Sequence, residues 1–204
     1  MTESNLTYLI TGASRGMGRG LSAAFLTRPN VTLVAAVRDP CNPQSKSLSN
    51  LPTGPGPRLI IDPAAAIYIL QHEHGINYLN IVIANAGMSD DFSRVDNVPI
   101  DVFRDHVEAV YPLLLRSARP TFVSIGSPLG SIGGMEQRPY PCTAYGLSKT
   151  TLHWIVRKVH FENEGFITFF ADPGAGGIVK LIDGATRESM GAQSRVWDGT
   201  VFPW

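Results

Sequence analysis

Tyr145 and Lys149 are the residues whose types and spacing point most directly to chemistry. Side chains four residues apart on a helix share one face, so these two can converge on one site. An unperturbed phenol, with a pKa of about 10, is a poor acid–base group near neutrality, but a nearby ammonium stabilises its phenolate. We therefore expect Lys149 to tune Tyr145 for proton transfer, although Tyr-x-x-x-Lys alone also occurs as a surface pair on ordinary helices.

A second chemical signal is the glycine-rich segment 11–18, TGASRGMG, which follows an apolar run and precedes the helical pattern Arg19–Leu26. Glycines permit a tight turn and a close approach of the backbone, and a helix N-terminus offers unpaired N–H groups to a pyrophosphate. The strand before, the helix after and the spacing T-G-x-x-x-G-x-G together favour a dinucleotide site over a plain glycine-rich turn.

Arg15 and Arg38 bear on the choice of cofactor. Arg38 follows the expected strand Val31–Val37, where NAD enzymes usually carry a carboxylate and NADP enzymes carry cations for the 2′-phosphate. Guanidinium groups bind phosphate through directed, charge-assisted hydrogen bonds. The sequence therefore favours NADP. The alternative is that Arg38 is a solvated loop cation paired with Asp39.

The apolar runs predict the elements that must position these residues. Continuous apolar runs are typical of strands covered on both faces, and their alternation with helical patterns predicts a doubly wound parallel sheet. In such a Rossmann-like, three-layer α/β/α fold, ligands bind at the carboxyl ends of the strands. A surface loop without regular structure is expected at 40–57. The expected strands are Thr7–Ile10, Val31–Val37, Arg58–Ile61, Leu79–Ala84, Thr121–Ile125 and Thr168–Ala171.

Length and composition narrow the classes of function. The chain has 204 residues, 44% of them hydrophobic, so we expect a single domain spanning 1–204. Lys plus Arg and Asp plus Glu number 17 each, which gives no field that would attract nucleic acid or an anionic membrane. The cysteine content and the absence of long apolar runs favour a cytoplasmic protein with a small-molecule partner. The histidines show no metal-ligand spacing, so no metal is expected.

Two further motifs complete an ordered set: Asn85-Ala86-Gly87 at the end of the fourth expected strand, and a serine-bearing loop after the fifth. In this order with the glycine loop and Tyr-x-x-x-Lys, the sequence resembles the short-chain dehydrogenase/reductase family. Residues 143–174 particularly resemble the fungal ketoreductases similar to norsolorinic acid ketoreductase, which act in polyketide secondary metabolism. The resemblance implies an NADPH-dependent reduction of a small carbonyl substrate.

The resemblance also implies roles for individual residues. In this family a serine hydrogen-bonds the substrate carbonyl, the cofactor delivers hydride, the tyrosine supplies the proton, and the lysine also holds the nicotinamide ribose. The implied catalytic residues are Ser127, Tyr145 and Lys149, with Ser131 as the alternative to Ser127. The implied cofactor contacts are Ile10, Gly12, Ser14, Arg15, Gly16, Gly18, Arg38, Asp62, Asn85, Tyr145, Lys149, Pro173 and Gly174.

Three segments depart from the family pattern and leave alternatives open. Asp62 either contacts adenine or caps the following helix. The segment 103–115 lacks the family's relay asparagine, and this helix commonly forms the dimer interface, so homo-oligomerisation is open too. The family's nicotinamide-contacting threonine and mobile substrate lid are missing after 172–174, which predicts an open site and slow chemistry. The alternative functions are a catalytically silent binding or scaffold protein and a non-redox isomerase or cyclase that uses Tyr145.

Overall fold

The computed structural model describes residues 5–63, 67–86, 110–172, 175–196 and 198–203. The chain forms two compact units, the first made of 1–86 and 101–121 and the second of 87–100 and 122–204. The expectation of a single domain over 1–204 stays a prediction.

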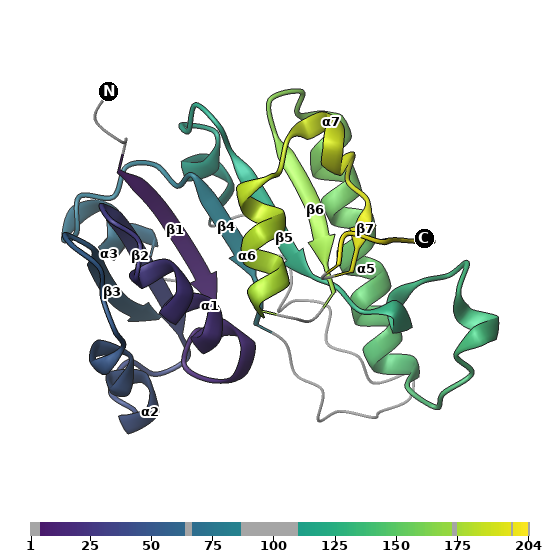
Figure 1. The fold of residues 1–204 in the computed structure, drawn as a ribbon, viewed down its shortest axis with the longest axis horizontal. Helices are drawn as coiled ribbons and strands as arrows, with labels where there is room; N and C mark the ends of the chain where they lie inside the picture. Colours follow the sequence, from purple (N-terminus) through teal and green to yellow (C-terminus); the bar gives the residue numbers. More distant parts are fainter. Residues whose placement is uncertain (1–4, 64–66, 87–109, 173–174, 197, 204) are drawn as a thin grey trace. The chain divides into compact units, whose positions relative to one another are not determined.

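The first unit contains four parallel strands in the order β3-β2-β1-β4 (Figure 1). Every residue of β2 is buried, as expected for a strand covered on both faces. The helix α1 follows β1 and packs its buried side chains against the sheet, where the ring of Phe25 stacks on that of Tyr8 at 4.4 Å between ring centres. The elements are β1 (Leu6–Thr11), α1 (Gly16–Leu26), β2 (Val31–Val37), α2 (Pro43–Lys46), η1 (Ser47–Asn50), β3 (Arg58–Pro63), α3 (Ile67–His72) and β4 (Ile81–Ala84).

The segment 40–57 was expected to lack regular structure, and that expectation is wrong. It contains the short helix α2 and the 3-10 turn η1. The Asn42 side chain accepts a hydrogen bond from the backbone N–H of Gln44, and Pro43 occupies the first helical position. Because proline is pre-organised for that position, the same residues that suggest a loop also start a helix here.

The second unit continues the alternation of strands and helices. The strand β6 pairs in parallel with β7, and β7 pairs antiparallel with β8. The long helix α5 lies behind the strands of this unit and α6 lies in front of them (Figure 1), which is the layering expected of a doubly wound sheet. The elements are β5 (Thr121–Ile125), η3 (Pro128–Gly130), η4 (Met135–Gln137), α5 (Thr143–Glu162), β6 (Ile167–Ala171), α6 (Ala175–Asp183), α7 (Arg187–Met190), β7 (Ser194–Arg195) and β8 (Val201–Phe202).

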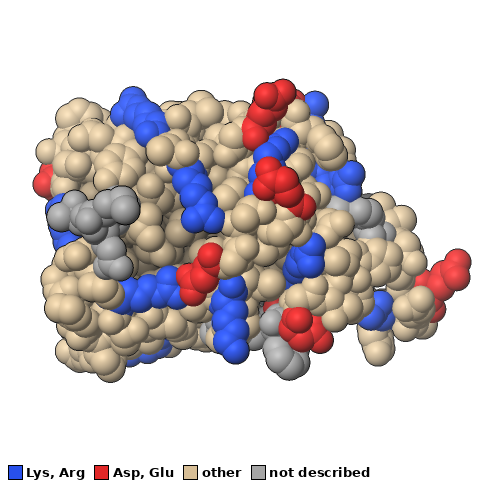
Figure 2. Space-filling model, turned by 45° about the horizontal axis from the view of Figure 1, so that its top comes forward, with Lys and Arg blue, Asp and Glu red and all other residues tan. Residues whose placement is uncertain are grey.

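The surface carries both signs of charge. On the face drawn in Figure 2, Lys and Arg side chains are interspersed with Asp and Glu side chains. Within the described ranges, no helix combines the length and the apolar character that crossing a bilayer requires.

Candidate cofactor and catalytic sites

The glycine loop of the first unit connects β1 to α1. Gly12 and Gly16 have φ values of +66° and +53°, in the left-handed region where glycine carries no steric penalty. The N–H of Gly12 donates to the carbonyl oxygen of Ala36 at 2.9 Å, which ties the loop to the carboxyl end of β2. The first turn of α1 contains no acidic side chain. Its first N–H groups, which lack partners within the helix, are therefore suited to an anion.

Asn85 supports this loop from the end of β4. Its side-chain Nδ2 donates to the carbonyl oxygens of Thr11, at 2.9 Å, and Gly12, at 3.3 Å. In return, the Thr11 hydroxyl accepts hydrogen bonds from the backbone N–H groups of Asn85 and Ala86. A Cβ atom on Gly18 would collide with the Gly12 carbonyl oxygen and with Nδ2 of Asn85. Only glycine fits at position 18 in this conformation, so the loop motif has a packing reason as well as a binding one.

The other predicted cofactor contacts of the first unit differ in exposure. Arg15, at the N-cap of α1, and Arg38, directly after β2, are both exposed, and Ser14 is half-buried. Asp39 accepts a hydrogen bond from the backbone N–H of Cys41 at 2.8 Å. Ile10 is fully buried in β1, so its contact with a cofactor stays a prediction that no exposed surface supports.

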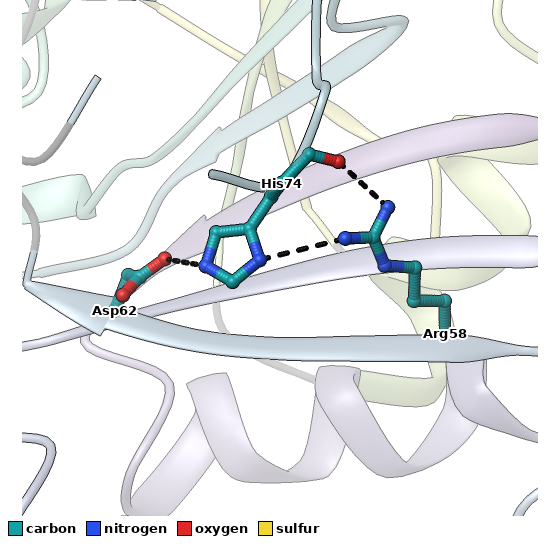
Figure 3. Close-up of polar contacts among 3 residues, drawn as sticks. All are labelled: Arg58, Asp62 and His74. Atoms are coloured by element: carbon teal, nitrogen blue, oxygen red, sulfur yellow. Dashed lines mark hydrogen bonds and ion pairs between the residues drawn. The ribbon is translucent and has the colours of Figure 1, made fainter. Parts of the chain in front are cut away.

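Asp62 lies inside β3 and is paired in register with Ala36 of β2. Pro63, the next residue, also belongs to β3 and is paired with Val37, so Asp62 does not directly precede a helix and the alternative that it caps one is wrong. One carboxylate oxygen of Asp62, Oδ2, lies 3.0 Å from Nε2 of His74 (Figure 3). On the other side of His74, the Arg58 guanidinium donates to the His74 carbonyl oxygen at 2.8 Å and lies 3.4 Å from the ring nitrogen Nδ1. Sequence reasoning missed His74 as the partner of Asp62 and Arg58 as the partner of His74.

Ser127 and Ser131 both follow β5 in the second unit, but their hydroxyl groups are engaged differently. The Ser131 hydroxyl donates to the carbonyl oxygen of Pro203 at 2.6 Å and accepts from the N–H of Gly134 at 3.0 Å. The Ser127 hydroxyl accepts from the N–H of Leu129 at 3.3 Å. Among the described residues, no acceptor is recorded for the hydroxyl hydrogen of Ser127, whereas that of Ser131 is bonded to Pro203. This difference favours Ser127 over Ser131 as the serine that binds the substrate carbonyl.

The helix α5 brings Tyr145 and Lys149 together, as their spacing predicts. The ammonium Nζ of Lys149 lies 5.6 Å from the centre of the Tyr145 ring and donates to the carbonyl oxygen of Ile125 at 2.8 Å. Burial lowers the pKa of Lys149, and the charge of Asp172 partly opposes this shift. The hydrogen bond to Ile125 anchors Lys149 to β5, the strand that precedes Ser127.

Two glycines let the loop after β5 approach α5 closely. A Cβ atom on Gly130 would lie 2.6 Å from the Cβ of Lys149, and one on Gly146 would lie 2.9 Å from the Leu129 carbonyl oxygen. The Thr150 hydroxyl donates across this contact to the Gly130 carbonyl oxygen at 2.9 Å. The loop that carries Ser127 is thus docked directly on the helix that carries Lys149.

Lys149 also has two buried ionisable neighbours that sequence reasoning did not assign to the site. Burial, followed by the charge of Lys149, lowers the pKa of His153 to about 4. Burial raises the pKa of Asp172, while Arg138 and then Lys149 oppose that shift. Nε2 of His153 and Oδ1 of Asp172 have no hydrogen-bond partner among the described residues. No cluster of three or more His, Cys, Asp or Glu side chains suited to a metal ion occurs in the described part of the chain.

The remaining predicted positions lie outside the described residues. These are Pro173 and Gly174, together with residues 103–109 of the segment in which the relay asparagine was sought.

No protein-family model matches the chain. The chain is 36% identical to the norsolorinic acid ketoreductase of Dothistroma septosporum, in an alignment covering 97% of this chain and 92% of that protein. It is 35% identical to the norsolorinic acid ketoreductase of Aspergillus parasiticus, covering 97% of this chain and 90% of that protein. A solved structure of a carbonyl reductase from Pseudomonas aeruginosa PAO1 in complex with NADP matches with a TM-score of 0.78 at 21% identity, covering 98% of this chain and 100% of that chain. This likeness confirms the predicted Rossmann-like fold class.

The chain is nevertheless shorter than its Dothistroma relative within the aligned region. That alignment has 248 positions and the whole chain has 204 residues, so at least 44 positions (248 minus 204) have no residue here. The difference agrees with the expectation that segments of the family pattern are abridged.

Proposed function

Because the chain belongs to the short-chain dehydrogenase/reductase family, we propose that it is an NADPH-dependent ketoreductase. NADPH, when bound, supplies the hydride that is added to the carbonyl carbon of the substrate. Tyr145 gives its phenolic proton to the carbonyl oxygen, so that a ketone becomes a secondary alcohol and NADP⁺ is released. Ser127 donates a hydrogen bond to the same oxygen and orients it.

The observation that carries this proposal is the position of Lys149 beside Tyr145. The ammonium lies 5.6 Å from the centre of the phenol ring, and its bond to Ile125 fixes it there. This position beside the phenol ring supports the assignment of Tyr145 as the proton donor and of Lys149 as its partner.

The residues of the first unit fit the phosphates of NADPH. The loop between β1 and α1 has no room for a Cβ at position 18, has a positive φ that favours glycine at positions 12 and 16, and presents the N-terminus of α1. Arg15 and Arg38 add two exposed cations, which suit the extra 2′-phosphate of NADP better than the free hydroxyl of NAD. The names of the two fungal relatives support an aromatic polyketide ketone as the substrate class. A cytoplasmic location stays a prediction.

The proposal is tested by two measurements on purified, monodisperse protein. Nicotinamide fluorescence and thermal unfolding with NADPH and NADH should show saturable binding with NADPH preferred, because a ligand that binds only the folded state raises its stability. NADPH consumption with a panel of aromatic ketones should then be abolished by Tyr145→Phe. Tyr140→Phe, which changes an exposed tyrosine just before α5, is the matched control.

The shortened chain favours one second candidate, a binding protein without turnover. At least 44 aligned positions have no residue here, and the sequence predicts that the family's substrate lid is missing after 172–174. A closing loop contributes strongly to turnover, so a chain without it would bind its ligands but turn them over poorly. NADPH binding without consumption of NADPH on any ketone would support that candidate. Substrate conversion without NADPH consumption would instead indicate an isomerase.

We also propose that the chain self-associates through α5. Leu147, Trp154 and Phe161 are spaced seven residues apart, so they lie along one face of the helix, and they are 42%, 64% and 66% exposed. Large apolar side chains aligned in this way are typical of a contact surface.

A further inference from the structure

Asp62, His74 and Arg58 form a chain of polar contacts in the first unit (Figure 3). The imidazole of His74 lies between the other two side chains, 3.0 Å from Oδ2 of Asp62 through Nε2 and 3.4 Å from the Arg58 guanidinium through Nδ1. The side chains of His74 and Asp62 are 30% and 14% exposed, so both are largely shielded from water.

Arg58 determines which nitrogen of His74 carries the proton. A guanidinium has only donors, so Nδ1 of His74 has to accept and Nε2 has to carry the hydrogen. Nε2 then faces Oδ2 of Asp62 at the ion-pair distance of 3.0 Å, without the geometry of a hydrogen bond, and Oδ2 is buried with no hydrogen-bond partner among the described residues. The shorter bond from Arg58 to the His74 carbonyl oxygen, at 2.8 Å, holds the guanidinium in place for this task.

The sheet register places Asp62 at the edge that carries the glycine loop. Thr11, Ala36 and Asp62 are paired across β1, β2 and β3, and Gly12 donates to the carbonyl oxygen of Ala36. Neighbouring strands lie about 4.8 Å apart, so Asp62 is roughly 10 Å from the loop on the side where Arg38 follows β2. If the pyrophosphate lies at α1 and the 2′-phosphate near Arg38, the adenine is the part that reaches β3.

We propose that His74 is a positioning residue for adenine recognition, holding the Asp62 carboxylate so that it accepts a hydrogen bond from the exocyclic amine of adenine. The inference rests on the proposed use of NADPH. It assigns to Arg58 the role of fixing the donating tautomer of His74. Because a carboxylate accepts but cannot donate, a base with a carbonyl in place of the amine loses this hydrogen bond.

The test compares NADPH with its hypoxanthine analogue, in which a carbonyl group replaces the adenine amine. Dissociation constants are measured by nicotinamide fluorescence for the wild-type protein, His74→Phe, His74→Gln and Arg58→Met. The wild type should prefer NADPH by about ten-fold or more, as expected for a hydrogen bond to a charged group. His74→Phe, which keeps a flat ring but has no donor, should reduce this preference to about two-fold or less.

The other variants separate positioning from simple structural support. His74→Gln retains a donor and should restore most of the preference, whereas Arg58→Met should give an intermediate value. His72→Gln is the matched control, because His72 bonds to the Tyr68 carbonyl oxygen and stacks on the Tyr68 ring instead. The turnover number at saturating NADPH should be unchanged in all of them, with the effect confined to the KM for the cofactor.

The outcomes distinguish this inference from the proposed function. A folded wild-type protein that binds neither nucleotide would overturn the proposed function and this inference with it. A wild type that binds both nucleotides equally, or a His74→Phe variant that keeps the full preference, would overturn the inference alone. If His74→Phe does not fold, Arg58→Met replaces it in the comparison. An Arg58→Met variant that keeps the full preference for NADPH would then overturn the inference.

Discussion

At the scale of single residues, alanine variants of Ser127 and Ser131 distinguish a hydroxyl that binds substrate from one that stabilises the fold. Ser127→Ala should lower kcat by about 10²–10³, the usual cost of removing a donor to a developing oxyanion, with little change in Tm. Ser131→Ala removes the bonds to Pro203 and Gly134, so it should lower the free energy of unfolding by about 1–3 kcal/mol while kcat changes little. Initial rates and thermal melts of the two variants check this. The opposite pattern would make Ser131 the carbonyl-binding residue.

His153 makes the stability of the protein dependent on pH. Burial, followed by Lys149, lowers its pKa from 6.5 to about 4 in the folded state. Between these two values the unfolded chain binds a proton that the folded chain does not, so the free energy of unfolding falls as the pH decreases. At about 1.4 kcal/mol per pKa unit, the loss over the whole window is on the order of 3 kcal/mol.

His153→Gln removes this titration and is the variant that tests it. Urea unfolding at several pH values from 7 to 4 should show a shallower loss of stability in His153→Gln than in the wild type, because only the titration of His153 is removed. Asp172, whose pKa is raised by burial, acts in the opposite direction and is retained in both proteins. His72→Gln, at an exposed histidine, should follow the wild type. Parallel curves for His153→Gln and the wild type would mean that His153 is not held neutral by burial.

Local spacing made part of the site predictable from sequence. Tyr145 and Lys149 are four residues apart on one helix, and their proximity follows from helical geometry alone. The contact between Asp62 and His74 depends on how the chain returns after α3, and the burial of His153 depends on how α5 packs against Phe170. Such contacts between distant segments have no signature in the sequence, which is why neither histidine was assigned to a site.

At the scale of elements, the contact between the loop after β5 and α5 depends on Gly130. Gly130→Ala would place a Cβ 2.6 Å from the Cβ of Lys149 and 2.8 Å from its backbone carbon. Overpacking of this kind costs about 1–3 kcal/mol. Because the shifted loop carries Ser127, kcat should fall together with Tm. Thermal melts and initial rates measure both effects.

Gly165→Ala is the matched control for this substitution. Gly165 lies in the turn after α5, and a Cβ there would meet no atom within 4 Å. Tm and kcat should therefore stay close to those of the wild type. A Gly130→Ala variant that behaves like Gly165→Ala would show that the close approach of loop and helix is not needed for activity.

Element bounds were predictable where burial and strand pairing coincide. The apolar runs at Val31–Val37 and Thr121–Ile125 match β2 and β5. The expected strand Leu79–Ala84 starts two residues too early, because β4 begins at Ile81, where the register with β1 starts at Tyr8. Asn80 is bonded to Thr7 through its backbone N–H and also through its side-chain oxygen, which accepts from the N–H of Thr7. The strand β3 extends past the apolar run to Pro63, since Asp62 is paired with Ala36 although it is polar. Hydrophobicity reports burial, whereas strand ends are set by backbone partners.

At the scale of the whole molecule, equal numbers of acidic and basic residues leave apolar contact as the driving force for self-association. The aligned side chains Leu147, Trp154 and Phe161 supply such a surface on α5. Light scattering after size exclusion should therefore give the wild type a mass of about twice the 22.1 kDa of the chain.

Trp154→Glu should convert that dimer to a monomer, because a carboxylate at the centre of the apolar surface would have to be desolvated without a partner. Tyr68→Glu is the control: it places the same charge at a 69% exposed aromatic residue of the first unit, and it should leave the mass unchanged. Since Trp154 is itself exposed in the chain, the Tm of the monomeric variant at low protein concentration should match that of the dissociated wild type. A wild type that is monomeric at all concentrations would overturn self-association through α5, and an unchanged mass for Trp154→Glu would move the interface to another surface.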